Sequence, residues 1–138
     1  MRKKEPVSHI MSTHLHTAKE NDTLFEAAAI IRKFKIRHLP VVKGKEIKGI
    51  ISSSDINRLT FGRLFEGEDD ADEAVFEMLS LEQVMTKNIR TVTSETTIKD
   101  VAEIFAKEDF HSLPVVDGGV LKGIVTTTDV IRYMLEQY

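Results

Sequence analysis

Hydrophobic and polar positions follow a helical period in two stretches of the chain. Apolar residues recur at i, i+3, i+4, i+7 and i+10 from Leu24 to Phe34, which predicts an amphipathic helix. The first four of these spacings recur from Ile98 to Phe105 and predict a second helix. Asp22 and Thr96 hold the positions where we expect the N-caps, because a side-chain oxygen there can accept a backbone N–H of the first turn.

Short apolar runs bounded by turn residues lie on both sides of each predicted helix. We expect extended segments at Leu15 to Ala18 and Ile89 to Thr93, and strands at Leu39 to Val42, Ile47 to Ser52 and Leu121 to Thr126. The turns Gly44-Lys45 and Gly118-Gly119 separate the strands of two hairpins. Further helices open at Ser54-Asp55 and Thr128-Asp129, so the predicted order is β-α-β-β-α, twice.

The chain repeats itself with an offset of 74 residues and no gap. Residues 10–59 lie over residues 84–133, and 16 of these 50 pairs are identical. Internal repetition means that each copy is a supersecondary unit that buries its apolar face against the other. We therefore predict an α+β fold of two β-α-β-β-α repeats related by pseudo-two-fold symmetry, with repeats at residues 7–60 and 81–136 and a linker at residues 61–80.

The predicted linker is acidic at its centre and apolar at its end. Its acidic run contains Glu66, Glu68, Asp69, Asp70, Asp72 and Glu73. Such a run is typical of a solvated linker. The apolar patch at Val75, Phe76, Met78 and Leu79 suits a short helix that caps the module. A regulatory or docking segment is the alternative, and the sequence leaves both open.

Composition narrows the class of protein. A chain of 138 residues with 41% hydrophobic and 30% charged residues is long enough for one compact domain and is typical of a soluble globular protein. The net charge of −3, with Lys and Arg spread along the chain, argues against a nucleic-acid-binding protein. The absence of Cys excludes thiolate metal sites. No apolar stretch predicts a signal peptide or a membrane span, so we expect a cytoplasmic protein.

Three motifs occur in the same order in both copies. They are Ile-Met-Ser and Val-Met-Thr at residues 10–12 and 84–86, Leu-Pro-Val-Val at residues 39–42 and 113–116, and Gly-h-h-[Ser/Thr]-x-x-Asp, with h hydrophobic, ending at Asp55 and Asp129. This pattern covers nearly the whole chain and resembles a tandem pair of CBS domains, often called a Bateman module. The resemblance implies a stand-alone regulatory module that catalyses nothing and binds AMP, ADP, ATP or S-adenosylmethionine in the cleft formed where the two copies pack.

The resemblance also implies which residues form the site. In the family, the motif Asp binds the ribose hydroxyls, and the motif Ser or Thr contacts ribose or phosphate. Residues before Leu-Pro-Val-Val reach the phosphates, and the first extended segment contacts adenine through its backbone. Carried onto this chain, the first site uses Thr17, Ala18, Arg37, His38, Pro40, Ser52, Ser54 and Asp55, and the second uses Thr91, Val92, His111, Ser112, Pro114, Thr126, Thr128 and Asp129.

The two sites are expected to be unequal, because the residues before Pro differ between the copies. Arg37 carries a forked charge suited to phosphate, with a solvated surface Arg as the alternative. The family's modules often form homodimers through their helices, so the expected partners are the nucleotide, a second copy and an unidentified protein target. No cofactor other than this regulatory ligand is implied.

The last motif also makes chemical sense by itself. A strand that turns into a helix points N–H groups and hydroxyls at one spot, where the helix dipole favours an anion. An ionised Asp only accepts hydrogen bonds, so the diol of a ribose is a suitable donor. The alternative is that Ser54, Asp55, Thr128 and Asp129 cap helices, which is compatible with binding. An interaction module with an empty or vestigial cleft is the competing hypothesis for the whole chain.

Catalytic and metal-binding interpretations have less support. The chain contains neither G-x-x-x-x-G-K-[ST] nor G-x-G-x-x-G, and nothing marks its Ser, His and Asp residues as a triad. We therefore predict no catalytic residues. His9, His14 and His16 lie close in sequence, but no further ligand stands at the usual spacing, so we predict no metal site.

Overall fold

The computed structural model describes residues 4–64 and 78–138. Its elements in chain order are η1 (Val7–His9), β1 (Ala18–Lys19), α1 (Leu24–Phe34), β2 (His38–Lys43), β3 (Glu46–Ser52), α2 (Ser53–Leu64), α4 (Leu81–Val84), α5 (Ile98–Lys107), β4 (Ser112–Asp117), β5 (Val120–Thr126) and α6 (Thr127–Glu136). The α+β class is confirmed, and the hairpin strands lie within one residue of their predicted bounds. In the second repeat the first strand is reduced to one parallel bridge, between Val92 and Val115.

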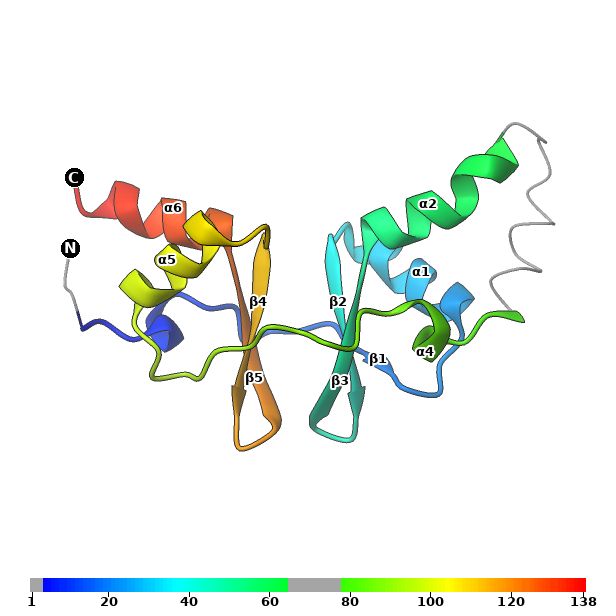
Figure 1. Cartoon of the computed structure of the whole chain (residues 1–138), viewed down its shortest axis with the longest axis horizontal. Coiled ribbons are helices and arrows are strands. Elements are labelled where there is room, and N and C mark those ends of the chain that lie inside the picture. The colour runs from blue at the N-terminus through cyan, green and yellow to red at the C-terminus, as the bar shows by residue number, and fades with distance from the viewer. Residues whose placement is uncertain (1–3, 65–77) are drawn as a thin grey trace. The chain divides into compact units, whose positions relative to one another are not determined.

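The chain packs as two compact units, and these are not the two sequence repeats. One unit is His16–Ile89, called the first unit below, and the other combines Met1–Leu15 with Arg90–Tyr138, called the second unit. Each repeat therefore contributes its leading segment, the residues up to Leu15 in the first repeat and up to Ile89 in the second, to the unit that contains the other repeat's hairpin. Figure 1 labels the elements of both units along the chain.

Paired backbone hydrogen bonds hold each leading segment in place. In the first unit, Ile50 and Thr86 donate to each other's carbonyls at 3.0 and 2.9 Å. In the second unit, Ser12 and Ile124 do the same at 2.9 and 3.0 Å. Each pair is an isolated antiparallel bridge on the second strand of a hairpin. The bridge gives that strand a further backbone partner inside its own unit.

The first unit is a small sheet with helices packed against it. Strand β1 pairs in parallel with β2, and β2 pairs antiparallel with β3. The turn residue Gly44 has φ +62°, a conformation that favours glycine and fits the predicted hairpin turn. The buried core consists of Ala18, Leu24, Ala27, Ala28, Ile31, Leu39, Val41, Ile51, Ile56, Leu81 and Met85. The leading segment of the second repeat thus supplies Leu81 and Met85 to this core.

The second unit repeats this arrangement around β4 and β5, which pair antiparallel. Its turn residues Gly118 and Gly119 have φ +56° and +83°, as the predicted Gly-Gly turn requires. The buried core consists of Val7, Val92, Val101, Leu113, Val115, Val125 and Val130. Val7, in the leading segment of the first repeat, is fully buried. The segment is held further by a hydrogen bond from the Tyr133 hydroxyl to Glu5 Oε1 at 2.9 Å.

The N-caps of α1 and α5 lie one residue later than predicted. Thr23 Oγ1 accepts the N–H of the third helical residue at 3.1 Å, and Thr97 Oγ1 does the same in the second repeat, also at 3.1 Å. Asp22 and Thr96 instead close the preceding turn, by accepting the N–H of the residue three positions before them at 2.8 and 3.0 Å. The prediction that Asp22 and Thr96 are N-caps is wrong, because the Thr that follows each of them accepts the capping hydrogen bond instead.

Most of the predicted linker lies outside the described residues, including the whole acidic run and the patch residues Val75 and Phe76. Of that patch, Met78 is 82% exposed, and Leu79 packs against the core of the first unit. Within residues 4–64 and 78–138, no helix is long and apolar enough to cross a membrane. The same residues contain no group of His, Asp and Glu side chains placed to hold a metal ion.

Candidate functional site

Each repeat places its Gly-h-h-[Ser/Thr]-x-x-Asp motif where its last strand meets its last helix. In the first repeat, β3 ends at Ser52 and α2 begins at the next residue. The Ser52 hydroxyl accepts the Asp55 N–H at 3.1 Å, and Asp55 Oδ2 accepts the Ser52 N–H at 2.9 Å. This reciprocal pair is a capping box, which fixes the carboxylate beside the helix N-terminus.

The second repeat contains the same capping box. Thr126 Oγ1 accepts the Asp129 N–H at 3.2 Å, and Asp129 Oδ2 accepts the Thr126 N–H at 2.9 Å. The N-caps are therefore Ser52 and Thr126, and the alternative that Ser54 and Thr128 are caps is wrong. Ser54 and Thr128 are the second residues of their helices and are exposed. The described part of the chain provides no hydrogen-bond acceptor for their backbone N–H groups.

The remaining carboxylate oxygen, Oδ1, differs between the repeats. Asp55 Oδ1 accepts a hydrogen bond from Arg58 Nη2, and the two side chains form an ion pair. Arg132 lies at the matching position three residues after Asp129. Among residues 4–64 and 78–138, nothing donates a hydrogen bond to Asp129 Oδ1. One motif therefore presents an unoccupied acceptor, and the other has both carboxylate oxygens bonded within the protein.

The register of the first hairpin brings the residues of Leu-Pro-Val-Val beside the motif. His38 lies opposite Ser52 across the β2–β3 pair. The carbonyl of Arg37 accepts the N–H of Ser53, the first residue of α2, at 2.8 Å. The Arg37 side chain is exposed, whereas Pro40 is buried. The helix start, the motif carboxylate and Arg37 therefore belong to one corner of the first unit.

The second hairpin repeats this corner with different side chains. Ser112 lies opposite Thr126, and the His111 carbonyl accepts the Thr127 N–H at 3.1 Å. Ser112 is a buried polar residue, 9% exposed, and Pro114 is also buried. The first corner thus has an exposed Arg and a half-buried His where the second corner has an exposed His and a buried Ser.

The first extended segments can offer less than predicted. Ala18 is fully buried and Val92 is 7% exposed, so neither side chain lies at the surface. The Val92 N–H donates to the Pro114 carbonyl at 3.1 Å, and its carbonyl accepts from Val116 at 2.7 Å. The bridge with β4 has therefore already taken the Val92 N–H. Its neighbour Thr91 is exposed.

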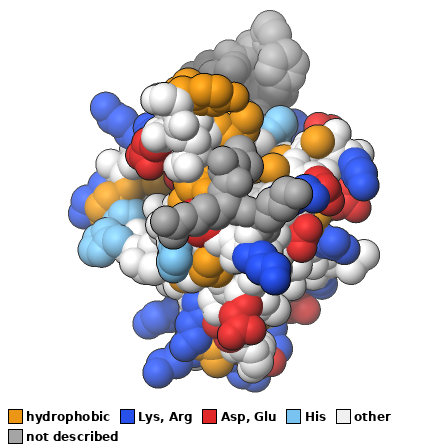
Figure 2. Space-filling view, turned by 90° about the vertical axis from the view of Figure 1, so that its left-hand side faces the viewer, with side chains coloured by type: hydrophobic (Ala, Val, Ile, Leu, Met, Phe, Trp, Pro, Cys, Tyr) orange, Lys and Arg blue, Asp and Glu red, His pale blue; other side chains and the backbone are white. Residues whose placement is uncertain are grey.

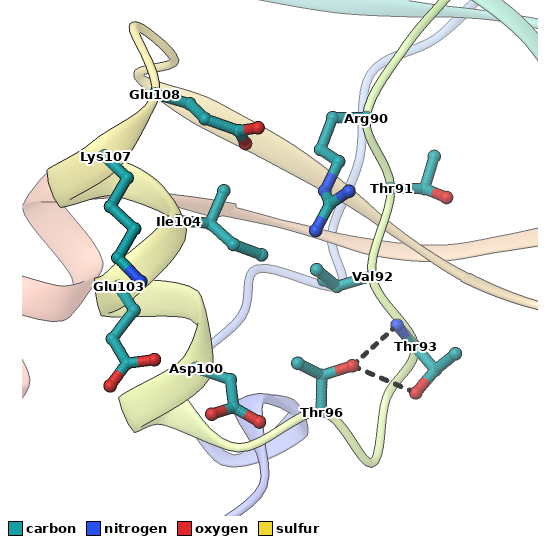
Figure 3. Close-up of a pocket in the computed structure, with 10 residues that line it drawn as sticks. All are labelled: Arg90, Thr91, Val92, Thr93, Thr96, Asp100, Glu103, Ile104, Lys107 and Glu108. Atoms are coloured by element: carbon teal, nitrogen blue, oxygen red, sulfur yellow. Dashed lines mark hydrogen bonds between the residues drawn. The ribbon is translucent and has the colours of Figure 1, made fainter.

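A cavity of about 520 Å³ lies between this extended segment and α5 (Figure 3). Its walls are Arg90, Thr91, Val92, Thr93, Thr96, Asp100, Glu103, Ile104, Lys107 and Glu108. Arg90 projects from the segment toward Ile104 of α5, and Glu108 lies just beyond the end of that helix (Figure 3). The lining of the cavity carries two cationic and three anionic side chains, and this net negative charge disfavours the phosphate of a nucleotide.

The first repeat fills the corresponding place with aromatic rings. His16 and Phe34, which align with Arg90 and Glu108, stack with their ring centroids 3.7 Å apart. The helical pattern placed Phe34 on the apolar face of α1, but it remains 43% exposed. The cavity beside α5 is therefore a product of the differences between the repeats.

A second cavity, of about 770 Å³, lies in the first unit beside the hairpin turn. Its walls are Thr17, Lys19, Glu20, Asn21, Val42, Lys43, Gly44, Ser80 and Glu82. In the second repeat, Asp117 replaces Lys43 and accepts the Ser94 N–H at 3.0 Å. Hydrogen bonds from the Ser94 side chain and backbone lower the pKa of Asp117 below its ordinary value. Neither cavity is lined by the motif hydroxyls or carboxylates.

The structure thus brings the motif residues of each repeat together with the residues before Pro, and leaves the first extended segments at the other edge of β2 or β4. Arg58 was not predicted, although the repeat alignment contains a signal for it. It is one of the 16 identical positions, and it stands three residues after the motif Asp, where a helix brings opposite charges into contact.

A family model described as "CBS domain" matches residues 7–61 and 81–136. One relative, an uncharacterized 17.7 kDa protein of Acidianus ambivalens, is 31% identical over 132 residues, which is 94% of this chain and 73% of the relative. The chain spans only 24% to 32% of several other relatives, among them homoserine O-acetyltransferases.

Solved structures share the fold. CBSX2 in complex with AMP has a TM-score of 0.80 and 26% sequence identity, and the match covers 96% of this chain and 98% of that one. CBSX2 is a CBS-pair protein from Arabidopsis thaliana. The CBS domain pair of protein MJ0100, in complex with 5′-methylthioadenosine and S-adenosyl-L-methionine, has a TM-score of 0.77 and 30% identity, with 96% and 98% covered.

Proposed function

Because the chain belongs to the CBS-domain family as a tandem pair of repeats, we propose that it is a regulatory module that binds an adenosine-containing nucleotide and catalyses no reaction itself. The observation that carries this proposal is the duplicated junction of strand and helix. Each junction holds a carboxylate by a capping box and exposes a hydroxyl and an unused N–H in the first helical turn. The carboxylate suits the ribose diol, and the N–H suits an anionic substituent.

The ligands of the similar structures support a nucleoside-centred site. CBSX2 is in complex with AMP, and the MJ0100 pair is in complex with 5′-methylthioadenosine and S-adenosylmethionine. These three ligands share adenine and ribose and differ in the charge of the 5′ substituent. A carboxylate that accepts hydrogen bonds from the ribose hydroxyls can bind all three ligands in the same way. We therefore assign ribose recognition to Asp55 and Asp129, and discrimination among nucleotides to residues around them.

Arg37 is our proposed phosphate ligand in the first repeat. Its carbonyl bonds to the helix start, which places its backbone beside the N–H groups that suit an anion. The corresponding residue of the second repeat is His111, whose imidazole lacks the forked guanidinium, so the repeats are expected to prefer different 5′ substituents. Arg37→Ala is expected to weaken ATP binding about ten- to a hundredfold, since a charge-assisted hydrogen bond contributes about 1.5–3 kcal/mol. Unchanged affinity in calorimetry would remove Arg37 from the site.

The first test is a thermal melt with and without AMP, ATP and S-adenosylmethionine. A ligand at about 100 times its Kd stabilises the folded chain by about 2.7 kcal/mol, which raises Tm by several degrees at this size. No shift with any of them would favour the competing hypothesis, an interaction module with an empty nucleotide site. That hypothesis has its own support, because the capping boxes alone explain why both carboxylates are present.

The second test separates ribose binding from helix capping. Asp129→Ala should weaken AMP binding and reduce the preference for AMP over 2′-deoxy-AMP at that repeat, because an unpaired buried acceptor costs about 1–3 kcal/mol. Loss of the cap alone lowers stability by about 1 kcal/mol and leaves the ribose preference unchanged. Affinity and melting are therefore measured for the same variant, with Asp55→Ala as its counterpart in the first repeat.

The relatives named as enzymes fit a regulatory role for the region that they share with this chain. The chain spans 24% of the homoserine O-acetyltransferases, so most of each relative lies outside the shared region. We assign the named activity to that remainder and regulation to the shared part. Supplying the purified chain with the substrates of that acetyl transfer should give no product, and turnover would contradict the assignment.

A specific observation also supports self-association. Helix α6 exposes Ile131, Met134 and Leu135, whose exposed fractions are 56%, 39% and 66%. They are spaced i, i+3 and i+4, so they form one apolar stripe on the helix surface. Figure 2 views the side of the molecule that carries the C-terminus and shows hydrophobic side chains exposed among charged ones. We propose that this stripe packs against α6 of a second copy.

Light scattering at tens of micromolar tests the dimer. The wild-type chain should have twice the monomer mass of 15.6 kDa, and Leu135→Lys should return it to the monomer. Glu136→Lys introduces the same side chain at the neighbouring exposed position, away from the stripe, and should leave the dimer intact. A monomeric wild type, or a dimer that tolerates Leu135→Lys, would contradict this interface.

A further inference from the structure

The two motifs follow the same pattern and are both followed by Arg at the third residue beyond Asp, yet they differ in one contact. Asp55 and Asp129 are each followed three residues later by Arg, at Arg58 and Arg132. In the first repeat Arg58 is bonded to the carboxylate. In the second, the described residues include no ion pair between Arg132 and Asp129. The duplicated Asp-x-x-Arg sequence therefore has two forms in the same chain. In the closed form Arg bonds to the carboxylate, and in the open form it does not.

The closed form occupies the oxygen that a nucleotide needs. Oδ2 of Asp55 accepts the Ser52 N–H within the capping box, so it cannot be released without loosening the helix start. Oδ1 is the oxygen left for a ligand, and Arg58 donates to it. The Asp55 side chain is only 12% exposed, so its open approaches are few. A ribose hydroxyl and the guanidinium therefore compete for one acceptor.

The guanidinium can be displaced at modest cost. The Arg58 side chain is 76% exposed, so water solvates it both in the pair and out of it. Ion pairs of this exposed kind have coupling energies that correspond to a change of roughly two- to fivefold in a binding constant. Salt weakens them further, because the Debye length is about 3 Å at 1 M. Arg58 is therefore suited to adjust ribose affinity without abolishing it.

We propose that Arg58 is a specificity-determining residue, which competes with the ribose diol for Asp55 and makes the first repeat less selective for ribonucleotides than the second. This inference rests on the proposed nucleotide-binding function and concerns the same site. It predicts that the two repeats, despite identical motif carboxylates, differ in their preference for AMP over 2′-deoxy-AMP. The difference has to vanish when Arg58 is removed.

The experiment measures that preference one repeat at a time by calorimetry. Asp129→Ala weakens the second repeat so that the first dominates the measured affinity, and Arg58→Ala is added to it. Asp55→Ala weakens the first repeat in the same way, and Arg132→Ala is added as the matched control. The ratio of the affinities for AMP and 2′-deoxy-AMP is compared within each pair, because any effect of the lost cation on phosphate cancels in the ratio.

Arg58→Ala should raise the ratio about two- to fivefold in the first pair, and Arg132→Ala should leave it unchanged in the second. In the Asp129→Ala background with Arg58 intact, 1 M salt should raise the ratio in the same direction. If AMP binds but Arg58→Ala leaves the affinity ratio unchanged, or if Arg132→Ala changes the ratio equally, the inference is overturned and the proposed function stands. Absence of AMP binding in the wild type and both backgrounds would overturn both.

A measurement without ligand tests the contact itself. A double-mutant cycle on the free energy of unfolding, with Asp55→Ala and Arg58→Ala, should give a coupling outside experimental error. The same cycle at Asp129 and Arg132 should give none. Equal couplings at the two repeats would show that the open and closed forms are not distinct, and would overturn the inference whatever the nucleotide data show.

Discussion

Replacing Gly49 by Ala should loosen the leading segment of the second repeat from the first unit. A Cβ atom at this position would lie 2.6 Å from the Sδ atom of Met85 and 2.9 Å from the carbonyl oxygen of Thr86. The sulfur belongs to a flexible side chain, but the carbonyl is backbone and takes part in the paired bonds with Ile50. Relief of the clash therefore has to move the segment itself.

The magnitude follows from that geometry. Forcing an extra methyl group into a packed site costs about 1–3 kcal/mol, because neighbouring atoms have to shift. Met85 is 8% exposed and belongs to the core of the first unit, so its displacement also disturbs buried contacts. For a chain of this size the corresponding fall in Tm is roughly 4–12 °C.

Hydrogen exchange locates the effect. In Gly49→Ala, the Ile50 and Thr86 amides should exchange faster, because these residues bond to each other across the contact. Gly123→Ala is the matched variant in the second unit, where the new Cβ would meet Met11 Sδ at 2.7 Å and a backbone carbonyl at 2.8 Å. It should loosen the Ser12–Ile124 bridge and leave the other intact. A Gly49→Ala chain with wild-type Tm and amide protection would refute the reasoning.

Three further changes test local contacts. Thr23→Ala removes the N-cap oxygen of α1 and should lower the free energy of unfolding by about 1 kcal/mol in a denaturant titration. Tyr133→Phe removes the donor to Glu5 and should cost about 1–2 kcal/mol in the same assay. Ser94→Ala should raise the pKa of Asp117 toward its ordinary value, as measured by carboxyl NMR. Because the folded state lowers this pKa, the contact stabilises the fold at pH values above the ordinary pKa. This stabilisation is lost as pH falls through the lowered pKa. The Ser94→Ala variant should therefore lose less stability than the wild type on acidification.

Local signals predicted the fold well because the elements themselves are locally encoded. The spacing of apolar residues from Leu24 to Phe34 matches the bounds of α1, and the Gly-Gly turn has the positive φ angles that it requires. The caps were displaced by one residue because adjacent residues, Asp22 and Thr23, are both capping types, and only the backbone angles distinguish them. Thr23 has the extended conformation of an N-cap, with φ −81° and ψ 160°.

The exchange of leading segments could not be predicted from the sequence. Thr86 lies just after the linker, near the start of the second repeat, and nothing in its local pattern says which hairpin it joins. That choice depends on a close approach to Gly49, more than thirty positions away, where a side chain would collide with Met85. Periodicity describes which face of an element is buried, but it carries no information about the partner that buries it.

The candidate site was predictable in its repeated part and unpredictable in its differences. Duplication points directly to Asp55 and Asp129, because both copies retain the residue at the same offset. It also made the two motifs look equivalent, since Arg58 and Arg132 are identical as well. Side-chain contacts distinguish them, and those depend on rotamers that no alignment records. If Arg58 competes with ribose as proposed, the two repeats bind the same nucleotide with different selectivity, and occupancy of the pair changes over a wider range of ligand concentration than that of two equal sites.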